Sequence, residues 1–127
     1  MTQALDFGPE FFDKFGVSFE KGDIIFCEYE PGTNFYFILE GRVKISKILS
    51  DKEKILDILE PGEVFGEMAY LLNEKRMATA ISETPSILLI IPADIFEELL
   101  QVNQPFARDI IQQLSNRLRK IHLPEKP

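Results

Sequence analysis

The chain has 127 residues, 45% of them hydrophobic and 11 of them phenylalanine, which fits one domain over residues 1–127 with a buried core. Its formal net charge of −7 argues against nucleic-acid binding, and its longest apolar run, residues 86–92, is far shorter than the ~20 residues of a membrane span. We therefore expect neither a nucleic-acid nor a membrane partner. The single cysteine, Cys27, and the lack of a signal peptide predict a cytoplasmic protein.

The first predicted element is a short helix within an N-terminal helical segment over residues 1–15. Phe11, Phe12 and Phe15 recur at helical spacing, which places apolar side chains on one face of a helix. We expect a helix over about residues 9–15 that packs on the rest of the domain through these phenylalanines.

Between residues 16 and 91 the pattern changes to short strands. Runs rich in Ile, Val, Phe and Leu are separated by turn signals at 21–23, 30–32, 40–41, 50–52 and 60–62. Regular turn signals at this spacing are typical of an all-β sandwich or barrel. Val43, Ile45 and Ile48 alternate with polar residues, among them Lys47, as in a strand with one face in water. We predict an antiparallel β-roll over residues 16–91.

Two helices are predicted over residues 92–122. The first follows Pro92, and its apolar stripe comprises Ile95, Phe96, Leu99, Leu100 and Val102. The second begins near Gln104, and its apolar positions are Phe106, Ile110, Ile111, Leu114, Leu118 and Ile121. Prolines at the end of the chain forbid further helix.

The segment Phe65–Ala69 and the later Arg76 carry the chemistry of the sequence. Gly66 lets backbone N–H groups approach an anionic oxygen, because it has no Cβ. A helical turn expected over residues 67–72 directs further N–H groups at the same anion, and Arg76 adds a planar fork of donors. Glu67 is an acceptor, which suits a sugar hydroxyl. Together these residues indicate a nucleotide that is held at its sugar and its phosphate.

This arrangement resembles the phosphate-binding cassette of the cyclic nucleotide-binding domain family. That family includes the catabolite-activator type regulators and the regulatory subunits of the cAMP-dependent protein kinase. The resemblance extends over about residues 16–122, and three further blocks, 19–26, 35–44 and 59–67, occur in the family's order. It implies a mainly β fold with flanking helices: a jelly-roll-like antiparallel β-roll, a short cassette helix and two C-terminal helices.

The resemblance also implies a set of site residues. The ligand-binding positions are Gly66, Glu67, Met68, Ala69, Arg76, Met77 and Ala78. Glu67 would accept a hydrogen bond from the ribose 2′-hydroxyl, and Arg76 would pair with the cyclic phosphate. The base would be covered from the last helix by Leu114, Leu118, Ile121 or Leu123. We expect Arg76→Ala to leave the unliganded protein almost as stable as the parent, because an arginine that awaits a phosphate has no protein partner.

The nucleotide is harder to predict. At Ala78 the family associates a hydroxyl residue with guanine, so alanine implies cAMP over cGMP, but Thr79 follows, and an alignment shift of one residue would reverse this inference. Met77 departs from the family, which has a small or hydroxylated residue there. Tyr29 replaces a glycine that is common in the family's second turn.

The predicted function is a cyclic-nucleotide sensor that signals to an output protein, unknown from the sequence, by movement of its C-terminal helices. The alternative is an interaction or dimerisation module with a β-roll that has lost nucleotide affinity, which Met77 favours. Relatives dimerise through the last helix, so we expect a homodimer through residues 104–122. The family's winged helix-turn-helix would follow that helix, and the five residues left after His122 cannot supply it.

An enzyme is not expected. A cupin-like metal site or a catalytic triad would need histidine, and His122 is the only one in the chain. We therefore predict no catalytic residues, no metal and no cofactor other than the nucleotide ligand. The basic residues Arg117, Arg119 and Lys120 are interpreted as a cationic helix end that suits the helix dipole.

Overall fold

The computed structural model describes residues 8–122 and contains four helices and eight strands in that range. Helix α1 (Gly8–Phe15) comes first, and α2 (Glu67–Leu72) interrupts the strands. The strands are β1 (Gly16–Phe19), β2 (Ile24–Phe26), β3 (Phe35–Glu40), β4 (Val43–Leu49), β5 (Lys52–Leu59), β6 (Val64–Phe65), β7 (Thr79–Ser82) and β8 (Ser86–Ile91). Helices α3 (Ala93–Val102) and α4 (Gln104–His122) end the described part.

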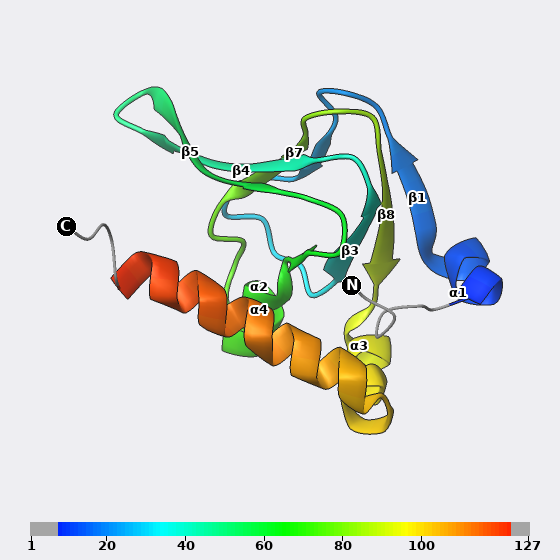
Figure 1. Ribbon diagram of the computed structural model, residues 1–127. Coiled ribbons are helices and arrows are strands. Elements are labelled where there is room, and N and C mark those ends of the chain that lie inside the picture. The colour runs from blue at the N-terminus through cyan, green and yellow to red at the C-terminus, as the bar shows by residue number, and fades with distance from the viewer. Residues whose placement is uncertain (1–7, 123–127) are drawn as a thin grey trace.

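The strands form two four-stranded sheets, in the orders β1-β8-β3-β6 and β2-β7-β4-β5, and every pairing is antiparallel. The helices α3 and α4 lie together below the strands, and the β4–β5 hairpin projects at the upper left (Figure 1). The predicted mainly β fold, with a cassette helix and two C-terminal helices, is therefore confirmed. No helix in the described range is long and apolar enough to span a bilayer.

Strand β3 serves two hydrophobic cores, because successive side chains of a strand point to opposite faces. Phe35 and Phe37 belong to the core under the helices, whereas Tyr36 and Ile38 belong to the core between the sheets. All four side chains are buried, which explains why this strand is apolar at consecutive positions rather than at alternate ones.

The C-terminal helices are fixed to the roll by aromatic contacts. Phe96 of α3 and Phe106 of α4 are almost completely buried, and their ring centroids lie 4.1 and 5.8 Å from that of Phe35. Val102, which the sequence placed on the buried stripe of α3, is 71% exposed. That prediction is wrong because Val102 is the last residue of α3 and lies beyond Leu100, the last residue of this helix that packs against the core.

Two further details of the sequence prediction need correction. Phe11 and Phe15 pack against the core, but Phe12 is 43% exposed. In β4, Ile48 is 61% exposed, whereas Lys47, expected in water, lines an internal pocket together with Ile45. Strict alternation from Val43 places Ile45 and Lys47 on one face, so the polarity of Lys47 was misleading.

We expect Gly41→Ala to destabilise the roll by more than the about 1–2 kcal/mol that a left-handed backbone alone costs. Gly41 has φ 90°, and a Cβ there would lie 2.3 Å from Ser86 Oγ and 2.5 Å from the Pro85 carbonyl oxygen. Gly22→Ala is the matched control, since Gly22 has the same φ and no atom within 4 Å of its would-be Cβ. Urea unfolding compares the two variants, and equal losses would contradict the steric argument.

Candidate functional site

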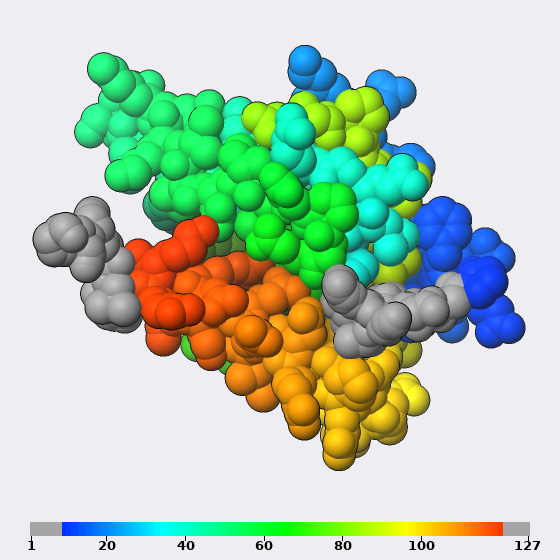
Figure 2. All heavy atoms as spheres, viewed as in Figure 1, coloured from blue at the N-terminus to red at the C-terminus, as the bar shows by residue number. Residues whose placement is uncertain are grey.

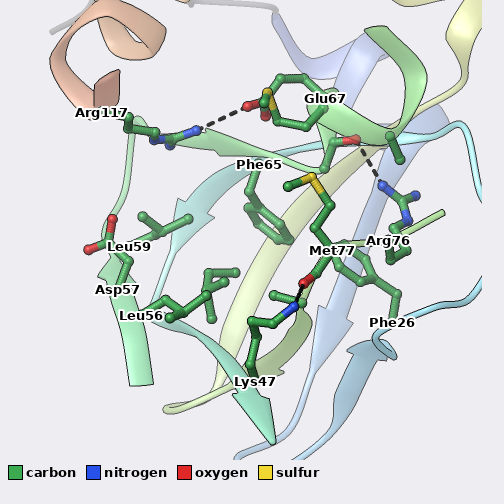
Figure 3. A pocket seen from close by; sticks show the side chains of 15 residues that line it. Phe26, Lys47, Leu56, Asp57, Leu59, Phe65, Glu67, Arg76, Met77 and Arg117 are labelled. Atoms are coloured by element: carbon green, nitrogen blue, oxygen red, sulfur yellow. Dashed lines mark hydrogen bonds and ion pairs between the residues drawn. The ribbon is translucent and has the colours of Figure 1, made fainter. Parts of the chain in front are cut away.

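A pocket of about 290 Å³ lies between the second sheet, the β6–α2 segment and α4. Figure 3 shows Glu67 and Arg117 on one side of it and Lys47 and Leu56 on the other. All seven predicted ligand-binding residues line this pocket: Gly66, Glu67, Met68, Ala69, Arg76, Met77 and Ala78. The structure thus brings the two halves of the motif, which are about ten residues apart in sequence, to one cavity.

Gly66 joins β6 to α2 in a conformation that requires glycine. Its φ is 84°, and a Cβ at this position would lie 2.8 Å from the ring of Tyr36 and 3.0 Å from Arg76 Nη1. Helix α2 begins immediately afterwards, and no side chain caps its first turn. Backbone and guanidinium can approach each other here because the side chain is absent.

Glu67 is a buried carboxylate with one unused oxygen. The residue is only 2% exposed, and its Oε2 lies 3.3 Å from Nη1 of Arg117. Its Oε1 is buried and accepts no hydrogen bond from the described residues. Burial raises the pKa of Glu67, and the positive charge of Arg117 opposes that rise. The pocket therefore contains an acceptor that lacks a donor among the described residues.

Arg76 is a buried cation that has carbonyl partners. It is 4% exposed, and it donates from Nη1 to the Gly66 carbonyl at 2.8 Å and from Nη2 to the Asn34 carbonyl at 3.0 Å. Its guanidinium carbon lies 4.2 Å from the ring centroid of Phe26. Burial lowers the pKa of Arg76, and no carboxylate among residues 8–122 forms an ion pair with it.

These contacts revise one expectation from the sequence. Arg76 already has protein partners, so its removal leaves two carbonyl groups without their donors and a gap beside the Phe26 ring. The unliganded protein should therefore lose stability when Arg76 is replaced.

Met77 and Ala78 occupy different parts of the pocket wall. Met77 is half exposed, its side chain extends across the middle of the view in Figure 3, and its carbonyl accepts a hydrogen bond from Lys47 Nζ at 2.8 Å. Ala78 is buried at the wall. Thr79 does not line the pocket, and its hydroxyl accepts a hydrogen bond from the Glu28 backbone N–H. Alanine, not threonine, is therefore the residue at this wall.

The rest of the wall is mostly apolar, and a β-bulge helps to form it. Apolar lining residues outside the cassette are Phe26, Ile45, Leu56, Leu59 and Phe65. Ile45 pairs with Asp57 and Ser46 with Ile55, which leaves Leu56 as an extra residue in β5. Bulges redirect a side chain in this way beside many binding sites. A flat aromatic base fits such a wall.

Of the four residues predicted to cover the base from the last helix, Leu114 and Leu118 do not line the pocket. Leu114 is half-buried against the core under the helices, and Leu118 is 56% exposed. The side chain of Ile121 and all of Leu123 lie outside the described residues. Among the described side chains of α4, which end at Lys120, Arg117 is the one that lines the pocket.

Sequence reasoning missed Arg117 because it interpreted the residue as part of a cationic helix end. Arg117 donates to Glu67 and to the Val64 carbonyl, and its side chain is 24% exposed. The available signal was its position one turn after Leu114, which is close to the buried stripe of the helix. A charge next to an apolar stripe suggests a buried partner of opposite sign.

Comparisons with known proteins agree with this geometry. The family described as the cyclic nucleotide-binding domain matches residues 16–103. A CRP-like cAMP-activated global transcriptional regulator of Mycobacterium tuberculosis is 29% identical over 105 residues, which is 82% of this chain and 47% of the regulator. This chain therefore spans about half the length of the curated relatives that it matches.

Solved structures lead to the same fold. The catabolite activator protein of Thermus thermophilus superposes with a TM-score of 0.77 at 28% identity, over 94% of this chain and 59% of that chain. The cAMP-bound form of the EAL enzyme Bd1971 superposes with a TM-score of 0.64 at 31% identity, over 85% of this chain and 29% of that chain.

One prediction from composition is wrong. The net charge of −7 led us to expect no nucleic-acid partner, but the relatives are transcriptional regulators, a class that acts at nucleic acids. The charge of a chain that spans about half of such a regulator does not bear on the other half.

The matched region begins with β1 and ends after α3, so it contains both sheets and the whole cassette. The four sequence blocks, the antiparallel roll and the structural neighbours agree. The chain belongs to the cyclic nucleotide-binding domain family.

Proposed function

We propose that this protein is a cytoplasmic cyclic-nucleotide sensor that binds cAMP and signals through α4 to an output partner. The observation that carries the proposal is the unpaired Oε1 of Glu67, which is buried in the same pocket as the guanidinium of Arg76. A buried acceptor without a donor is costly, and a ligand hydroxyl would satisfy it. No catalytic role is proposed for the pocket.

The phosphate end of the proposed site is formed by Arg76 and the turn at Gly66. A guanidinium has five N–H donors, and two of its nitrogens donate here to the carbonyls of Gly66 and Asn34. The remaining donors are available to a phosphate. No carboxylate among residues 8–122 forms a direct ion pair with Arg76, although Glu30 and Glu67 favour its charged form from a distance. An anion in the pocket would give this partly desolvated cation a direct partner.

The base would lie against the apolar wall that includes Leu56 and Leu59. Ala78 offers no hydroxyl to a guanine edge, and the hydroxyl of Thr79 is engaged by Glu28, which supports cAMP over cGMP. The Mycobacterium tuberculosis relative is described as cAMP-activated. The EAL enzyme Bd1971 has both a cAMP-bound and a cGMP-bound form, so cGMP belongs in every binding test.

Signalling would start from the contact between Glu67 and Arg117. A ribose hydroxyl that donates to Glu67 would change the strength of its ion pair with Arg117, and this ion pair attaches α4 to the roll. Ligand binding shifts a conformational equilibrium only if it favours one helix position over another. This contact is where such a difference in free energy would arise.

We expect calorimetry to detect cAMP binding once co-purified ligand has been removed by unfolding and refolding. Glu67→Ala should weaken cAMP binding about tenfold or more, because a hydrogen bond to a charged group contributes about 1.5–3 kcal/mol. Its effect on 2′-deoxy-cAMP should be much smaller, since that ligand lacks the hydroxyl. If the parent binds neither cAMP nor cGMP, the chain is instead the interaction module that lost nucleotide affinity.

Arg76→Ala should reduce cAMP affinity roughly 10- to 1,000-fold, because a charge-assisted contact to the phosphate is lost. The free energy of unfolding without ligand should also fall, by about 1–3 kcal/mol, since the carbonyls of Gly66 and Asn34 lose their donors. Arg119→Ala, an exposed change of the same kind on α4, is the control. Unchanged affinity in a folded Arg76→Ala protein would exclude Arg76 from ligand binding.

We propose a homodimer through residues 104–122. In the stripe predicted for this contact, Phe106 and Ile110 are almost completely covered, whereas Leu118 is 56% exposed. Ile111, beside that stripe, is 64% exposed. Ile111 and Leu118 are two turns apart and therefore lie on one side of α4. Pairing of two such helices gives a self-complementary contact.

Light scattering should give the mass of a dimer for the parent, and Ile111→Glu should shift it toward the monomer. Gln112→Glu changes an exposed neighbour of Ile111 on the same helix and should leave the dimer intact. A parent that stays monomeric at high protein concentration would exclude this interface.

A further inference from the structure

Gln113 of α4 forms an unusually complete set of hydrogen bonds. Its Nε2 donates to the Gly62 carbonyl at 2.9 Å and to Asp109 Oδ2 at 2.8 Å. Its Oε1 accepts from the Val64 backbone N–H at 2.9 Å and lies 3.5 Å from Nη2 of Arg117. A side-chain amide has two donors and two acceptor positions, so every position is occupied and only one orientation satisfies all of them.

The backbone groups that Gln113 contacts belong to a free sheet edge. Strand β6 is last in the order β1-β8-β3-β6 and pairs only with β3 among the described strands. Its outer edge presents the N–H and the C=O of Val64. Gln113 takes the N–H, and Arg117, one helical turn later, takes the C=O. Two side chains of α4 therefore act as the missing neighbour strand.

Arg117 has two carboxylates within reach. Its Nη1 lies 3.3 Å from Glu67 Oε2, and its Nη2 lies 3.7 Å from Glu63 Oε1. The side chain of Glu63 is 40% exposed, whereas that of Glu67 is 3% exposed. Glu63 is therefore a second, more exposed partner toward which Arg117 can turn when its side chain is not held in place.

We infer that Gln113 is a positioning residue of the nucleotide site: by pairing with the edge of β6, it holds Arg117 on Glu67. The inference rests on the proposed function and deepens it, because it names the residue that couples the position of α4 on the roll to Glu67, the proposed acceptor for the ribose hydroxyl. Gln113 does not line the pocket. It acts through Arg117.

The inference can be tested without nucleotide by ¹³C NMR titration of the Glu67 carboxyl group. Arg117→Met removes the cation and should raise the pKa of Glu67, because Arg117 opposes the effect of burial. Gln113→Leu should shift that pKa in the same direction, since Arg117 is released from Glu67. Gln112→Leu, a change at the exposed adjacent position, should leave it where the parent has it.

A titration of Gln113→Leu that coincides with the parent, while that of Arg117→Met is shifted, would overturn the inference. If Gln113→Leu does not fold, Gln113→Asn serves instead, because its amide is one methylene too short to reach both Gly62 and Val64. A purely structural role would lower the unfolding midpoint and leave the Glu67 titration unchanged.

Calorimetry then tests whether Gln113 affects discrimination between cAMP and 2′-deoxy-cAMP. Gln113→Leu should weaken cAMP binding about 3- to 10-fold, a change of about one hydrogen bond, and should weaken 2′-deoxy-cAMP binding less. Equal losses for the two nucleotides would overturn the link to the ribose. If the parent binds no nucleotide, the proposed function fails, whereas the Glu67 titration still decides whether Gln113 positions Arg117.

Discussion

The ion pair between Glu67 and Arg117 is the interaction on which the arrangement of the site depends. A carboxylate that is 2% exposed needs compensation for the water that it has lost. The compensating charge comes from α4, about fifty residues later in the chain. Burial of Glu67 thus requires α4 to lie across the end of the roll, where the orange and red atoms of the helix meet the green atoms of the middle of the chain (Figure 2).

The two arginines of the pocket differ in their interaction partners. Arg117 has carboxylate partners, whereas Arg76 has carbonyl and aromatic partners and no carboxylate among the described residues. The pocket therefore combines a carboxylate oxygen without a donor and a guanidinium without a direct ion pair among the described residues. A ligand that carries a hydroxyl beside a phosphate complements both, and this complementarity is more specific than the apolar wall around it.

Sequence patterns predicted the features that depend on local backbone geometry, such as turns, strands and helices. Gly66 was identified because it has no Cβ to keep the backbone from a ligand, and the structure gives it a φ of 84°. The strands between Gly16 and Ile91 followed from the spacing of turns. The same reasoning failed where tertiary contacts decide. Lys47 lines the pocket although it is polar, and Arg117 pairs with a residue far away in sequence. Such pairings depend on how α4 crosses the roll, which no local period encodes.

The attachment of α4 changes in character along its length. Its first half is held by buried Phe106 and Ile110, and its second half by Gln113, Arg117 and Lys120, the last at 3.6 Å from Asp57. Dissolved ions screen partly exposed charges but leave apolar contacts intact or strengthen them. Raised ionic strength should therefore weaken the exposed contact of Lys120 with Asp57 first, while the buried pair of Arg117 and Glu67 is screened much less, so that the end of α4 responds to the electrolyte of its surroundings before the segment beside the pocket does.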